Sequence, residues 1–151
     1  MRGTNLKRLG GHQSGLSMIE VLIAILISVI GLFSVMKMQL AAVSNTHSAY
    51  LRSQAAVVSN AMVDQLRANS SAALNGDYDL TLSATPPTEG GIEATDLAQW
   101  RTNLATILPS GVGSVACVSA TQICTLVVQW DDSRGLAGGN AQQFSLAVRL
   151  Q

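Results

Sequence analysis

One carboxylate stands inside a run of residues that otherwise has the composition of a membrane helix. From Leu16 to Met36 there are 21 residues, and Glu20 is the only one whose side chain ionises. A run of this length can cross a hydrocarbon core of about 30 Å at about 1.5 Å per residue. Because an acid in that core costs roughly 2.5–3.5 kcal/mol on insertion scales, Glu20 indicates a functional site that needs a cationic partner. The alternative is a polar residue that reaches back toward the lipid head groups.

The other residues that could do chemistry form weaker patterns. Asp131 and Asp132 are paired carboxylates beside Trp130 and could bind calcium or exchange protons, but the segment Asp-Asp-Ser-Arg-Gly also has the composition of a solvated turn. His47 is interpreted as a solvated or half-buried position, since His12 is the only other histidine and two cannot build a metal site. The sequence has no Ser/His/Asp or Cys/His set with a known spacing and no glycine-rich phosphate loop. We therefore expect neither an enzyme nor a cofactor.

The fifteen residues ahead of the apolar run carry three basic side chains and no acidic one. Arg2, Lys7 and Arg8 carry the charge, and Gly10, Gly11 and Gly15 disfavour a helix. A secretory signal peptide also begins with basic residues, but its apolar part is about 7–15 residues long and ends at a small-residue cleavage site. Here the apolar run is longer, and residues 40–43 make at best a weak site of that kind. The basic segment predicts a cytoplasmic N-terminus, with the rest of the chain outside.

The order of these features resembles the type IV prepilin signal: a basic leader that ends in Gly15, an apolar residue, three more residues, Glu20 and an unbroken apolar helix. In that family a membrane peptidase cuts after the glycine and methylates the new N-terminus, and the helix is retained. The resemblance implies cleavage between Gly15 and Leu16 and a methylated amine on Leu16, where the family usually has Phe. It also implies an assembly charge pair between Glu20 and the Leu16 amine of the same or a neighbouring subunit, which low dielectric would strengthen.

This processing would divide the chain into a cleaved leader (1–15), a transmembrane part of the N-terminal helix (16–36), an amphipathic continuation (37–70) and a periplasmic globular domain (71–151). The formal charge is zero, and the leader holds three of the nine basic residues, so the mature chain keeps six against nine acidic ones. With no basic patch and few aromatic residues, we expect no direct binding of nucleic acid.

Beyond the membrane run, apolar and small residues continue at helical spacing. No proline interrupts the chain from Leu16 to Arg67. The pattern predicts that the helix continues and packs one face on a small domain. The residues of this face are Leu40, Val43, His47, Tyr50, Gln54, Val57, Ala61 and Leu66.

The C-terminal half reads as a short α+β unit. Alternating apolar residues predict strands, and Leu97, Trp100, Leu104 and Leu108 predict one helix, capped by Thr95 or Asp96. The predicted strands are 78–84, 114–118, 123–130 and 144–151. We expect an α+β fold of the type IV pilin kind, with the long N-terminal helix packed on an antiparallel sheet of about four strands plus one short helix.

Two cysteines flank a plausible four-residue hairpin loop. If residues 119–122 form the loop, Val118 faces Ile123 and Cys117 faces Cys124, close enough for a disulfide. The exported side of the membrane favours the bond, and two reduced core thiols are the alternative. Two cysteines alone supply too few ligands for a metal.

Within the pilin superfamily, the chain is similar to PilV-type minor pilins, the type IV pilus modification group. The similarity covers Ser17–Ala24, Ile30–Leu32, Leu97–Trp100, Cys117 and Val127–Asp132. It implies a low-abundance inner-membrane subunit that meets the prepilin peptidase and the pilus assembly platform. Such a subunit joins other minor and major pilins at the tip of the filament, primes assembly and so supports twitching motility and adhesion. A minor pseudopilin of type II secretion and a single-span, membrane-anchored periplasmic binding protein are the alternatives.

Overall fold

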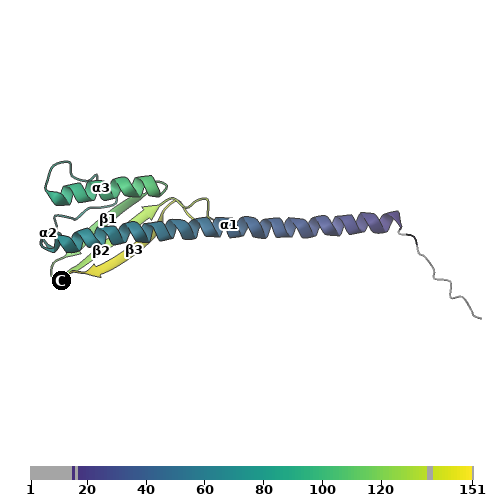
Figure 1. The fold of residues 1–151 in the computed structure, drawn as a ribbon, viewed down its shortest axis with the longest axis horizontal. Helices are drawn as coiled ribbons and strands as arrows, with labels where there is room; N and C mark the ends of the chain where they lie inside the picture. Colours follow the sequence, from purple (N-terminus) through teal and green to yellow (C-terminus); the bar gives the residue numbers. More distant parts are fainter. Residues whose placement is uncertain (1–14, 16, 136–137, 151) are drawn as a thin grey trace, which may run out of the picture. The chain divides into compact units, whose positions relative to one another are not determined.

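The computed structural model describes Gly15, residues 17–135 and residues 138–150. The chain divides into two compact units, Met1–Gln39 and Leu40–Gln151. Within these residues, three helices and three strands follow one another along the sequence (Figure 1). The elements are α1 (Met18–Ala68), α2 (Ser70–Asn75), α3 (Ile92–Ile107), β1 (Val112–Val118), β2 (Ile123–Trp130) and β3 (Gln142–Arg149).

The second unit has the expected α+β layout. Within it, α1 and α3 cover one face of an antiparallel sheet with the strand order β1-β2-β3. Side chains along β2 alternate between buried and more exposed positions, as a sheet covered on one face requires. The core includes both tryptophans. Trp100 is 3% exposed and donates its indole N–H to the Val58 carbonyl, and Trp130 is buried as well.

The sheet has three strands within the described residues, and the predicted strand over 78–84 is wrong. Only Leu80 pairs with β1, through two backbone hydrogen bonds to Val115. The backbone that follows Leu80 has a different partner. The Arg101 guanidinium on α3 donates hydrogen bonds to three of its carbonyl groups. These acceptors are the carbonyls of Thr81, Leu82 and Ala84. Among the described residues this segment makes no further ladder bonds to β1 beyond Leu80, so the alternation does not produce a strand.

The buried face of α1 differs from the face predicted by its spacing. Of the predicted set only Leu66 is buried, whereas Val43, Tyr50 and Val57 are exposed. The residues that pack on the sheet are Leu51, Ala55, Val58, Ser59, Met62, Val63 and Leu66. Adjacent residues such as Val57 and Val58 are both apolar, so the helical spacing is compatible with two apolar faces that are shifted by one residue. Only the packing on the sheet decides which face is buried. His47 is exposed, as expected for a solvated position.

The helix α3 begins one turn earlier than predicted. Gly91 precedes its first residue, and the Glu93 carboxylate, in the first turn, accepts the Gly91 N–H at 2.8 Å. Asp96, which the sequence suggested as a cap, lies inside the helix. Its carboxylate instead accepts the hydroxyl of the buried Tyr78 at 2.7 Å.

This buried tyrosine predicts a loss of stability in alkali. Burial first, and then the hydrogen bond to Asp96, raises the pKa of Tyr78 from 10.0 to about 12. Because the folded state favours the neutral phenol, its contribution is complete below about pH 10 and is lost as the pH rises through about 12. We expect the free energy of unfolding to fall over this interval, measured by chemical denaturation at each pH. In Tyr78→Phe this part of the decline should be absent; an equal slope in both proteins would contradict the assignment.

Candidate functional site

The candidate site is the start of α1, where Ser17 and Glu20 shape the first turn. The Ile19 N–H donates to the Ser17 hydroxyl at 3.4 Å, and the Glu20 N–H donates to the Ser17 carbonyl at 3.0 Å. Ser17 therefore caps the helix, and Glu20 occupies the third helical position, where an acid also stabilises the positive end of the helix dipole. The Ser-x-x-Glu spacing of residues 17–20 is the sequence signal of this capping arrangement.

Glu20 has no cationic neighbour among the residues described. Its side chain is exposed. The salt bridge found among the described residues joins Arg67 and Asp64, near the other end of α1. The amine expected to pair with it belongs to Leu16, which lies outside the described residues, as does most of the predicted leader. Gly15 is described and exposed. The predicted cleavage, methylation and charge pair at Gly15, Leu16 and Glu20 therefore remain predictions.

The apolar side chains that follow Glu20 are exposed all around the helix. Large side chains from Met18 to Met38 have exposed fractions between 44% and 85%. A helix that is apolar on every side requires a membrane or a bundle of other helices around it. Among the described residues, α1 is the one helix long and apolar enough to cross a membrane, which is compatible with a single-pass anchor near the N-terminus.

The two serines within this apolar segment are already satisfied. Ser28 donates its hydroxyl to the Ala24 carbonyl at 2.7 Å, and Ser34 donates to the Ile30 carbonyl at 3.1 Å. Such bonds inside the helix remove the cost of a bare hydroxyl in lipid. Glu20 is thus the residue between 17 and 36 whose polar group still needs a partner from outside its own helix.

No family model, curated protein or solved structure matches this chain at a significant level.

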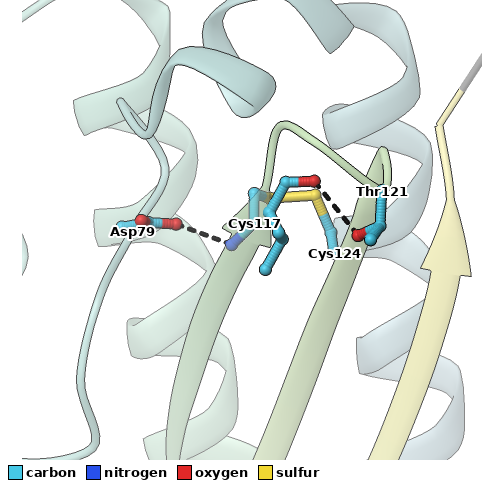
Figure 2. Close-up of a disulfide and its surroundings, with 5 residues drawn as sticks. Asp79, Cys117, Thr121 and Cys124 are labelled. Atoms are coloured by element: carbon cyan, nitrogen blue, oxygen red, sulfur yellow. Dashed lines mark hydrogen bonds between the residues drawn. A yellow bond between two sulfur atoms is a disulfide. The ribbon is translucent and has the colours of Figure 1, made fainter.

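The predicted cysteine pair is joined by a disulfide at the end of the β1–β2 hairpin (Figure 2). Cys117 faces Cys124 and Val118 faces Ile123, in the register expected from the sequence. The Thr121 hydroxyl and N–H both donate to the Val118 carbonyl and close the turn. On the other side, the Asp79 carboxylate accepts the Cys117 N–H at 2.8 Å. The bond therefore lies between a tight turn and a segment docked on β1.

Breaking this disulfide should weaken the domain without unfolding it. The bond closes a loop of eight residues, which contributes about 2.5 kcal/mol in the chain-entropy model. We expect Cys117→Ser combined with Cys124→Ser to lower the free energy of unfolding by about this amount. Chemical denaturation of both proteins measures the difference. Thiol counts on the denatured protein provide the control, because two thiols should appear only after reduction; equal counts before and after would contradict the bond.

The two adjacent aspartates have different environments. Asp131 is half-buried and its carboxylate accepts the Ser133 N–H at 2.8 Å; this bond chiefly lowers the pKa of Asp131. Asp132 is not the solvated turn residue suggested by its neighbours. Its side chain is 2% exposed and accepts the Ser48 hydroxyl from α1 at 3.1 Å. No cluster of three potential metal ligands occurs in the part of the chain described, so these contacts indicate that Asp132 ties the loop to α1.

Proposed function

We propose that this chain is a minor pilin of a type IV pilus, processed by a prepilin peptidase and incorporated near the filament tip, where it helps to prime assembly. The observation that carries the proposal is the start of α1. A lone carboxylate lies in the first turn of α1, five residues after Gly15, at the start of an apolar segment that is exposed on every side; the same helix continues into an α+β domain with a disulfide.

The arrangement gives each part a physical task. The apolar segment holds the subunit in the inner membrane before assembly and is covered by other subunits afterwards. Cleavage after Gly15 creates an amine on Leu16, and Glu20 neutralises it as both leave water. The exposed face of α1 that includes Val43, Tyr50 and Val57 supplies further apolar surface for neighbouring pilins. Twitching motility and adhesion would then be properties of the filament.

Intact mass and N-terminal sequencing of the protein from native membranes test this proposal. We expect a chain that begins at a methylated Leu16, and Gly15→Val should retain the whole leader because the family's peptidase cuts after a glycine. A wild-type chain that still carries Met1, or one cut near Ala42, would overturn the proposal. Recovery of the mature protein in sheared pili, as opposed to the envelope of secreting cells, separates a pilus subunit from a secretion pseudopilin.

A further inference from the structure

The end of α2 carries the one Asn-Gly pair of this chain, Asn75-Gly76. Asn75 is the last residue of the helix and is exposed, and Gly76 follows it with a φ of 90°. Helices very commonly end on a glycine in this left-handed conformation, because a residue with a Cβ is strained there. The turn therefore requires a glycine at the position that directly follows an exposed asparagine.

An asparagine followed by glycine can undergo deamidation without an enzyme. The backbone nitrogen of the glycine attacks the side-chain carbonyl carbon of the asparagine and forms a C–N bond, while the bond to the side-chain nitrogen breaks. Ammonia leaves and takes the amide proton of the glycine with it. The five-membered succinimide then takes up one water molecule from the solvent and opens to aspartate or to isoaspartate. Isoaspartate carries one more carbon in the main chain. Glycine favours the attack because no Cβ shields its nitrogen.

In the folded chain the attacking nitrogen is engaged. The Gly76 N–H donates to the Ala73 carbonyl at 3.2 Å, and the Asp77 N–H donates to the Ala72 carbonyl at 3.0 Å. Together these two bonds form a Schellman cap. Closure of the succinimide ring requires the Gly76 N–H to leave its acceptor and Asn75 to leave the helical conformation. The reaction must therefore wait until this end of α2, a helix of six residues, opens.

The segment that follows the cap covers the outer edge of β1. The Asp79 N–H donates to the Gly76 carbonyl at 3.0 Å, and the Asp79 carboxylate accepts the Cys117 N–H at 2.8 Å (Figure 2). Leu80 pairs with Val115 through two backbone hydrogen bonds. An extra main-chain carbon just before Gly76 would shift this segment out of its register with β1.

We propose that Asn75 is a site of spontaneous deamidation that the cap of α2 keeps closed, and that its conversion to isoaspartate releases residues 77–80 from β1. The modification marks chains in which the end of α2 has opened. Refolding does not remove the mark, because the lengthened backbone no longer fits the cap. The inference depends on this cap alone and not on the proposed function.

Peptide mapping by mass spectrometry measures the reaction in the full chain, kept in detergent micelles in a mildly alkaline buffer. A synthetic peptide of residues 70–80 is the reference without a cap, because so short a helix is marginal in water. Asn75 should convert in the peptide and roughly thirtyfold more slowly in the folded chain, as the loss of two backbone hydrogen bonds implies. Equal rates would overturn the closing role of the cap. An unreacted Asn75 in the peptide would overturn the site itself.

Two matched variants test whether local opening controls the rate. Ala72→Gly weakens α2 but leaves the Asn-Gly pair intact, and should speed the conversion at least about fivefold, since glycine disfavours a helix interior. Ala98→Gly makes the same change at an exposed position of α3 and should leave the rate unchanged. Equal acceleration by both variants would show that global unfolding exposes Gly76, and would overturn the local opening.

Hydrogen exchange tests the consequence of the modification. In chains whose Asn75 has become isoaspartate, the amides of Leu80 and Cys117 should exchange faster than in the parent. Asn75→Asp adds the charge but no main-chain carbon, so it should keep nearly the protection of the parent. Unchanged exchange in the isoaspartate chains, or an equal loss of protection in Asn75→Asp, would overturn the proposed release. None of these readouts depends on cleavage at Gly15.

Discussion

Replacing Glu20 with glutamine should leave leader removal intact and reduce the amount of this protein in sheared filaments about a hundredfold or more. Removing one partner of a buried ion pair costs about 3–5 kcal/mol, because the other charge stays uncompensated in low dielectric. Glutamine is chosen because it can still act at the third position of a capped helix. The substitution therefore removes the charge while preserving the local turn that Ser17 and Glu20 form.

Quantitative immunoblots of sheared pili and of membranes from the same cells measure this effect. Ser28→Ala is the matched control, since its hydroxyl bonds to its own helix and needs no partner subunit. Ser17→Ala weakens the cap by about 1 kcal/mol without changing the charge, and should reduce incorporation far less. If Glu20→Gln were recovered in filaments in the same amount as the wild-type protein, the carboxylate would act only in stabilising the start of α1.

The second large effect is expected in the core, at Trp100. Its ring is 3% exposed, its indole N–H donates to the Val58 carbonyl at 3.2 Å, and it lies against the backbone of Gly113. Trp100→Ala should lower the free energy of unfolding by about 3–5 kcal/mol, since it leaves a cavity and removes the hydrogen bond to the Val58 carbonyl. Denaturant titration followed by Trp130 fluorescence measures the loss in full-length protein, because Trp130 is present in both variants.

A second substitution shows whether the effect depends on this contact. A Cβ on Gly113 would collide with the Trp100 ring, so Gly113→Ala should destabilise the parent protein. In the Trp100→Ala background the same methyl group enters the cavity and should cost little. The two changes are then strongly non-additive, as expected for residues in contact. Additive effects would show that the glycine and the tryptophan act independently. Thr102→Ala, on the exposed side of α3, should leave stability nearly unchanged.

Sequence reasoning succeeded where one local pattern had one physical solution. The apolar run and its proline-free continuation predicted a helix that the structure places at Met18–Ala68. The strand Ile123–Trp130 has the predicted bounds. Four residues between Val118 and Ile123 fix a hairpin register, and that register places Cys117 opposite Cys124. Local spacing determines each of these features.

It failed where the outcome depended on a distant partner. Alternation over 78–84 has the form of a strand, but Arg101, about twenty residues away in sequence, takes its carbonyls. The residues beside Asp132 in the sequence are typical of a turn. Asp132 is buried because its loop docks on α1, where Ser48 donates to its carboxylate. The Ser-x-x-Glu spacing of residues 17–20 is enough to predict that Ser17 caps the helix. The sequence interpretation considered only the charge of Glu20 and missed this role. The predicted partner of Glu20, the amine of Leu16, lies outside the described residues, so the charge pair stays a prediction.

The position of the disulfide has a mechanical consequence. It joins two residues seven positions apart at the end of one hairpin, so it shortens the chain that can be drawn out under tension by only about 20 Å, at about 3.5 Å per residue. A pull applied between α1 and the end of β3 meets no covalent crosslink along most of its path. Resistance to stretching must therefore come from the ladder that joins β3 to β2 and from the packing of α1 on the sheet.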